Sequence, residues 1–133
     1  MSFLVCLASD MPLPSVDMAG EGSFSVRPIA HGDDLQSKKT WLAAVEWNDC
    51  PPDYARLLDY IRCHLKTAPE LELWHSWMGG GGEEEYPPLV KKRVKYLDEL
   101  TAIDVEEICK TDVFQPYFDN VDVGKQNCLL IRV

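Results

Sequence analysis

The segment at residues 70–78, which reads Glu-Leu-Glu-Leu-Trp-His-Ser-Trp-Met, constrains the fold most strongly because its side chains alternate in character. One set is apolar apart from a histidine: Leu71, Leu73, His75 and Trp77. The other set is more polar: Glu70, Glu72, Trp74 and Ser76. A period of two is typical of a strand with one buried face. We therefore expect a strand that turns its imidazole toward apolar neighbours and its glutamates toward solvent.

Apolar periodicity divides the remaining chain into further strands and two helices. The other strands are predicted at 3–9, 24–29, 40–47, 89–97 and 127–133. The first helix is predicted within 48–70, because Pro51 and Pro52 suit a first turn and apolar residues then recur at helical spacing. The second is predicted at 101–111, where Thr101 and Asp104 fit a capping box. The apolar residues of 89–97 also fit a helix, but the break needed before the next helix favours a strand.

The resulting order, β-β-β-α-β-β-α-β, predicts an α+β fold. We expect a mostly antiparallel sheet of about six strands with both helices on one face. The strand at 3–9 is apolar on both faces, which indicates a central position, and Pro28 suits the end of a strand or an edge strand. With 133 residues, 46% of them hydrophobic, and no linker, residues 1–133 are predicted to form a single domain. The second face of the sheet is covered by tryptophans or meets a partner.

Charge and cysteine usage limit the classes of function. The chain has 13 basic and 22 acidic residues, a formal charge of -9, which repels nucleic acids and anionic membranes. Its basic residues cluster at 91–95, which we interpret as a solvated strand face. No apolar run is long enough for an export signal or a membrane span. Five cysteines without a C-x-x-C pair indicate a reducing cytoplasm, and we expect no metal and no cofactor.

Two short motifs are interpreted as connections. The glycines at 79–82 are followed by three glutamates and contain no Gly-Lys-Ser/Thr, so 79–88 is predicted as a polar connection and not as a phosphate loop. Ser9 is not surrounded by a nucleophile elbow. We therefore expect Ser9-Asp10-Met11-Pro12 to form a turn in which Asp10 accepts hydrogen bonds from nearby backbone N–H groups.

The stretch Phe-Leu-Val-Cys-Leu-Ala-Ser-Asp-Met-Pro-Leu-Pro at 3–14 resembles the start of a group of small, uncharacterised bacterial proteins. Those proteins open with an apolar strand followed by A-S-D-x-P-L-P, and a weaker likeness continues to the acidic segment after Trp77. Members often carry a Gly/Cys-rich run before the first helix, where this chain has only Cys50, which argues against thiol or metal chemistry here. The resemblance implies a bacterial cytoplasmic protein and supplies no function.

His75 is the sharpest candidate for chemistry. An imidazole among apolar residues needs a partner, since an unsatisfied buried ring nitrogen costs about 1–3 kcal/mol. Asp10 or Glu46 from a neighbouring strand could orient the ring as a general base. The pocket would lie between sheet and helices, walled by Trp47 and Trp77. The alternative is a core or half-exposed histidine that is hydrogen-bonded to the backbone.

Two functions remain open at this point. The first is a non-catalytic acidic binding module, whose open sheet face and Gly/Glu segment meet a cationic protein or a second copy of the chain. Trp74, with Glu72 and Ser76 on its face, is expected at the interface or at a pocket rim, and Trp47 and Trp77 are the other candidate binding residues. The second function is a small enzyme or small-molecule-binding protein with its pocket around His75.

Overall fold

The computed structural model describes residues 2–18, 24–30, 35, 37–48, 50–78, 89–111, 114–118 and 121–133. Its strands are β1 (Ser2–Ser9), β2 (Val16–Met18), β3 (Phe24–Ile29), β4 (Trp41–Glu46), β5 (Glu70–Met78), β6 (Leu89–Tyr96), β7 (Phe114–Phe118) and β8 (Val121–Arg132). Its helices are α1 (Pro51–His64), α2 (Ala102–Lys110) and a 3-10 turn, Leu97–Glu99. The predicted connection at 79–88 lies outside the described residues.

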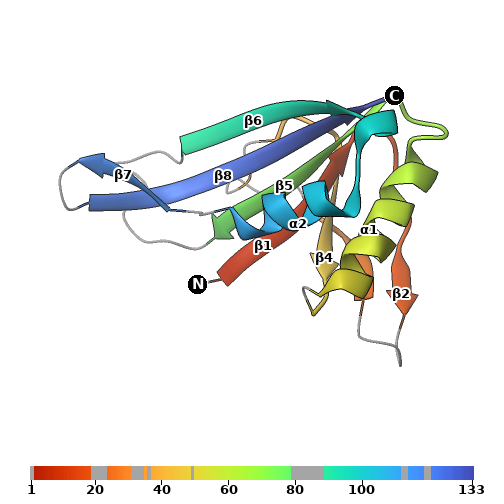
Figure 1. The fold of residues 1–133 in the computed structure, drawn as a ribbon, viewed down its shortest axis with the longest axis horizontal. Coiled ribbons are helices and arrows are strands. Elements are labelled where there is room, and N and C mark those ends of the chain that lie inside the picture. The colour runs from red at the N-terminus through yellow and green to blue at the C-terminus, as the bar shows by residue number, and fades with distance from the viewer. Residues whose placement is uncertain are drawn as a thin grey trace.

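Within the described residues, the strands follow the order β2-β3-β4-β1-β5-β8-β6, and β7 pairs only with the first part of β8 (Figure 1). Of the described strand pairs, β6–β8 alone is parallel. The predicted α+β class and mostly antiparallel sheet are confirmed, and the expected number of strands is close. β1 lies between β4 and β5, as its apolar side chains on both faces predict.

Both long helices lie on one face of this sheet (Figure 1). α1 begins at Pro51 because two prolines fit a first turn, where backbone N–H groups need no helical partner. α2 begins after Thr101, whose N–H donates a 2.8 Å hydrogen bond to Asp104 in the predicted capping box. Apolar residues of both helices and of five strands form the main core: Leu7, Phe24, Val26, Ala43, Val45, Tyr54, Leu57, Leu58, Ile61, Leu71, Leu73, Val105, Ile108, Leu129 and Ile131 among them.

The opposite face of the sheet carries a second, smaller core. Its buried members are Cys6, Ala8, Leu35, Leu42, Trp74 and Cys128. Leu35 precedes β4 in the chain and packs against strand residues on the side away from the helices. The centre of this face is therefore buried from solvent, and Trp74 is part of this smaller core. None of the described helices is long and apolar enough to cross a membrane.

Two strands, β2 and β7, were not predicted from the sequence, and the position of a third strand in the sheet was predicted wrongly. β2 has three residues, too few for a period of two to be visible, and β7 contains Pro116 at an irregular register. The segment 24–29 was expected to suit an edge, but β3 lies one strand inside it. β2 pairs only with residues 24–26, so Pro28 lies beyond that pairing and its missing N–H costs no hydrogen bond to β2.

Candidate functional site

His75 lies on the helix face of β5. Its cross-strand neighbours are Val5 on β1 and Asn127 on β8, so the three side chains share a face. His75 is 7% exposed, and Leu73 on the same face belongs to the main core. The predicted strand is confirmed, and His75 is buried on the face of Leu71 and Leu73. The expected solvent face is wrong, because Glu72, Trp74 and Ser76 on the other side of the strand are buried as well.

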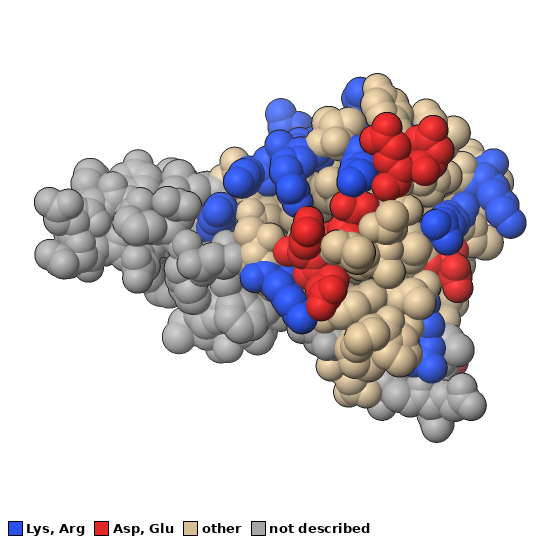
Figure 2. All heavy atoms as spheres, in the orientation of Figure 1, with Lys and Arg blue, Asp and Glu red and all other residues tan. Residues whose placement is uncertain are grey.

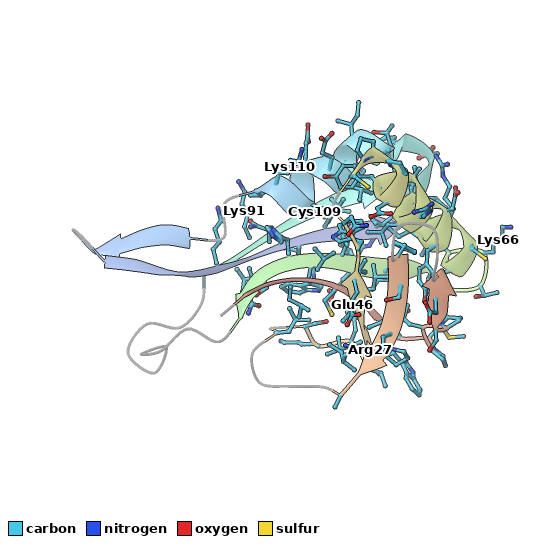
Figure 3. All side chains as sticks on the ribbon, turned by 90° about the horizontal axis from the view of Figure 1, so that it is seen from below. Arg27, Glu46, Lys66, Lys91, Cys109 and Lys110 are labelled. Atoms are coloured by element: carbon cyan, nitrogen blue, oxygen red, sulfur yellow. The ribbon has the colours of Figure 1, made fainter. Side chains whose placement is uncertain are left out.

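The structure does not bring Asp10 or Glu46 to His75. Val5 of β1 lies opposite His75. Asp10 lies beyond the end of β1, and five residues of extended chain separate it from Val5 by about 16 Å. Its carboxylate accepts a 2.9 Å hydrogen bond from Lys39. Glu46 is two strands away and points to the side of the sheet opposite the helices, where it pairs with Arg27 (Figure 3). Each carboxylate has a cationic partner elsewhere, so the predicted acid–base unit does not form from these residues.

Trp74 is not at the surface, and the expectation that it forms an interface or pocket rim is wrong. Its side chain is 2% exposed and lies between Cys6 and Cys128 on the neighbouring strands. Its indole N–H donates a 3.0 Å hydrogen bond to Glu72. The polar neighbours that suggested exposure are themselves buried, so Trp74 is a core residue.

The other tryptophans have different positions. Trp47 is half-buried on the helix face, with its ring 5.5 Å from that of Tyr54 and 6.5 Å from that of Phe24. The backbone of Trp77 belongs to β5, and its side chain lies outside the described part of the chain. Trp41, at the first position of β4, is 45% exposed. Trp47 therefore packs between β3 and α1. Trp41 is the most exposed of the three tryptophans whose side chains the structure describes.

Glu72 is a buried anion at the centre of the second face, contrary to the expected outward orientation. It is 3% exposed. One oxygen accepts hydrogen bonds from Ser37 at 2.6 Å and from Trp74, and the other accepts one from Lys92 at 2.8 Å. Burial alone would raise the pKa of Glu72, but the three donors outweigh burial and hold its pKa below the ordinary value. Glu72 thus joins β5, β6 and the segment that precedes β4.

Two fully buried thiols flank this carboxylate network. Burial raises the pKa of Cys6 to about 12, and burial together with the charge of Glu72 does the same for Cys128. Only a thiolate is a strong nucleophile or metal ligand, so neither side chain is reactive at neutral pH. Cys63 is exposed, as expected from its position off the apolar stripe of α1. These positions support a structural role for the buried cysteines.

A second polar contact, between Ser9 and His64, was not predicted. Ser9 Oγ and His64 Nε2 are 2.7 Å apart, and Ser9 Oγ also accepts the backbone N–H of Met11 at 3.1 Å. Burial lowers the pKa of His64, which favours the neutral imidazole. A serine nucleophile must meet its substrate, but Ser9 is 0% exposed. The contact joins the end of β1 to the end of α1, and Ser9, not Asp10, holds the turn.

β6 carries four cations, Lys91, Lys92, Arg93 and Lys95. Lys92 is bound to Glu72 and Lys95 to Asp104, whereas Lys91 and Arg93 have no carboxylate partner among the described residues. Register places Lys91, Arg93 and Lys95 on the helix face, because Lys91 is paired with Asn127 and Lys95 contacts α2. Figure 2 shows Lys and Arg side chains gathered over β6 and the nearby end of α2.

A groove of about 500 Å³ runs between β6 and α2. Its lining residues are Lys91, Arg93, Ile103, Glu106, Glu107, Ile108, Lys110, Thr111 and Asn127. Lys110 forms a 2.8 Å ion pair with Glu106 and lies over the ring of Tyr54, so its charge is partly committed. Lys91 and Lys110 line the same groove and lie close together in Figure 3. The groove therefore offers uncommitted positive charge on its β6 side.

The opposite face of β6 is apolar and open. Val90, Val94 and Tyr96 alternate with the helix-face cations and share the side of Lys92. They are 46%, 52% and 51% exposed, respectively. Because the smaller core lies over β1, β4, β5 and β8, its cover ends before this strand. β6 is thus a terminal strand with exposed side chains on both faces.

Sequence patterns could have indicated part of this arrangement. His64 follows Ile61 by three positions and Leu57 by seven, so the helical stripe predicts it on the buried face of α1. The basic cluster at 91–95 was visible, but its relation to α2 depends on tertiary packing. Nothing in the local sequence distinguishes buried Glu72 from half-buried Glu70.

Together these observations describe an α+β fold in which the centre of the sheet is buried on both faces. One terminal strand, β6, has exposed side chains on both faces. Within the described residues, no three His, Cys, Asp or Glu side chains gather as a metal ion would require. No family model, curated protein or solved structure is detectably similar to this chain.

Proposed function

We propose that this chain is a non-catalytic interaction module that binds another protein along β6. The observation that carries the proposal is the exposure of Val90, Val94 and Tyr96 on the open face of a terminal strand. Exposed apolar side chains in a row mark binding surfaces, and an unpaired strand edge provides backbone groups for a partner. At the opposite end of the sheet, the described part of the chain forms the three-residue strand β2, which offers a much shorter edge.

The positions of the titratable residues support binding over catalysis. Glu72 is saturated with donors, Ser9 and His64 are buried against each other, and His75 has neither Asp10 nor Glu46 beside it. Catalytic groups must reach a substrate, and these groups are held inside the sheet or beneath the helices. These positions favour a binding module over an enzyme, and the proposed interaction surface lies at β6 and not at Trp74.

We also propose that the module works in the cytoplasm. All five cysteines lie in the described part of the chain and form no disulfide bond, and three of them are buried. Free thiols persist in a reducing compartment. The formal charge of -9 further disfavours nucleic acid as the partner.

Site-specific photocrosslinking in cells tests the proposed interface. A photoreactive residue at Val94 should trap one recurring protein, because this side chain is 52% exposed on the open face. The matched control carries the same group at Lys66, an exposed site far from Lys91 in Figure 3. The trapped protein should bind the purified chain, and Val94→Asp should weaken that binding at least tenfold while the variant keeps its folded circular dichroism spectrum.

Two outcomes contradict the proposal. One is equal crosslinking from Val94 and Lys66, since that pattern reflects random collision. The other is binding of the trapped protein that Val94→Asp leaves unchanged. Sedimentation of the purified chain with and without the trapped protein gives an independent measure of complex formation.

A further inference from the structure

The terminal strand β6 has a free backbone edge that a partner strand can extend. β6 has eight residues and no proline, and within the described residues only β8 pairs with it. A strand at a sheet edge presents unpaired N–H and C=O groups, and extended peptides bind such edges through main-chain hydrogen bonds. The edge therefore fits an extended segment better than a helix.

The charges on β6 indicate which kind of extended segment would bind to its edge. Lys91 and Arg93 project on the helix face without a carboxylate partner in the described structure, two positions apart on the same strand. Residues directly opposite each other in paired strands share a face, and opposite charges there are stabilising. A partner strand with acidic residues at alternate positions would place carboxylates beside both cations.

The exposed side chains on the second face of β6 indicate which residues of the partner strand should lie between its acidic positions. Val90 and Val94 are exposed on the open side, so the intervening residues of the partner strand would lie beside them. Apolar or aromatic side chains at these positions would cover the two valines. The complementary pattern is thus an alternation of acidic and apolar residues.

The groove wall argues against a general polyanion site. Glu106 and Glu107 of α2 line the same groove as the cations, and they repel dense negative charge such as polyphosphate. A strand that carries single carboxylates at alternate positions can contact β6 without crowding α2. The mixed lining therefore favours a peptide over a polyanion.

The same charges disfavour pairing between two copies of β6. Cations occupy positions 91, 92, 93 and 95. In any two-fold antiparallel pair centred between residues 92 and 94, at least two cations would face each other. Like charges directly opposite are destabilising, so the strand edge is poorly suited to self-association.

We propose that β6 binds an extended segment of another protein in which acidic and apolar residues alternate, and that this segment adds to the sheet as a further strand. This inference rests on the proposed function and names the chemistry of the partner. Main-chain pairing supplies the edge contact, while Lys91, Arg93 and the exposed valines supply specificity. The interaction weakens with salt, because exposed charges are screened over about 8 Å at 0.15 M ionic strength.

Titration of the full chain with synthetic octapeptides tests the partner class. The probe alternates glutamate and valine, and three controls are a block peptide of the same composition, oligoglutamate, and the probe with alternate backbone nitrogens methylated. We expect the probe to bind at least tenfold more tightly than each control. Arg93→Glu and Lys91→Glu should each weaken it at least tenfold, whereas Lys66→Glu, which also reverses an exposed charge, should change it less than twofold.

The outcomes separate this inference from the proposed function. Equal binding of oligoglutamate overturns strand addition, and equal binding of the methylated probe overturns main-chain pairing. If none of the peptides binds but the photoreactive group at position 94 still traps a protein whose binding depends on β6, the acidic class of partner is wrong. The proposed function as an interaction module is then unaffected. If Arg93→Glu reduces folding, the milder Arg93→Gln replaces it, with an expected loss of at least threefold. Dimerisation through β6 would also overturn the assignment.

Discussion

Glu72 shows how a charged residue becomes part of a protein interior. Burial of a carboxylate is costly unless hydrogen bonds and a counter-charge compensate for lost water. Ser37, Trp74 and Lys92 provide that compensation, and Lys92 reaches Glu72 from the neighbouring β6. The carboxylate therefore fixes the position of the strand that carries the proposed binding edge.

Replacement of Glu72 by glutamine should destabilise the fold. Glu72→Gln keeps the shape but removes the charge that Lys92 needs and offers a donor in place of one acceptor, so we expect a loss of about 1–3 kcal/mol in the free energy of unfolding. Urea denaturation measures this loss. Glu46→Gln is the matched control, because Glu46 pairs with Arg27 at the exposed surface and should cost about 0–1 kcal/mol. Equal losses would contradict the buried network.

His64 should make stability depend on pH below neutrality. Burial lowers its folded-state pKa, so the unfolded chain binds a proton at a higher pH than the folded chain does. The stability from the neutral imidazole is fully present above the unfolded pKa of about 6.5 and is lost as pH falls toward the folded pKa. His64→Gln should make the free energy of unfolding less dependent on pH below about pH 6.5 than it is in the parent chain. Parallel pH profiles would contradict this account.

The elements show which parts of the fold were predictable. β5, α1 and α2 carry strong local signals: strict alternation in β5, prolines at the start of α1 and a capping box at the start of α2. β2 and β7 are short or contain proline, so their pairing depends on neighbouring strands and has no clear local signal. Local pattern thus predicts the layers, while the edges of the sheet are set by tertiary contacts.

The candidate site was predicted less well for the same reason. The alternating pattern correctly predicts that His75 is buried on the face of Leu73. It does not predict which residues of other strands lie opposite, such as Asn127 beside His75. Ser37 reaches Glu72 from a segment 35 positions earlier. Lys39 pairs with both Asp10 and Glu70, so Asp10 lies near the first residue of β5 and not beside His75. Trp74 therefore becomes a core residue although its sequence neighbours are polar.

The capping box gives a prediction at the scale of α2. Thr101→Ala removes the side chain that accepts a hydrogen bond from the first turn and should cost about 1 kcal/mol in the free energy of unfolding. Thr40→Ala is the control at an exposed turn position and should change it by less than about 0.5 kcal/mol. Thermal denaturation of both variants measures the difference, and similar effects would argue against the cap.

At the scale of the whole molecule, exposed apolar side chains and buried, hydrogen-bonded polar side chains lie in different parts of the sheet. The helices and the smaller core seal the middle of the sheet, and Glu72 and the Ser9–His64 contact satisfy buried polar groups. Exposed apolar side chains and free cations remain together at β6. The chain is acidic overall, but β6 carries four cations, and two of them, Lys91 and Arg93, have no carboxylate partner among the described residues. This strand therefore differs in sign from the chain as a whole, which favours an acidic partner there.

Amide hydrogen exchange of the full chain, with and without the protein trapped at Val94, tests the central claim most directly. We predict that the partner slows exchange at backbone amides of β6, with the main change confined to this strand and the facing side of α2. Central strands β1 and β5 should be protected in both states, since they are paired on both sides. Protection that instead appears at β2 and β3, with β6 unchanged, would contradict the claim that this protein binds its partner along β6.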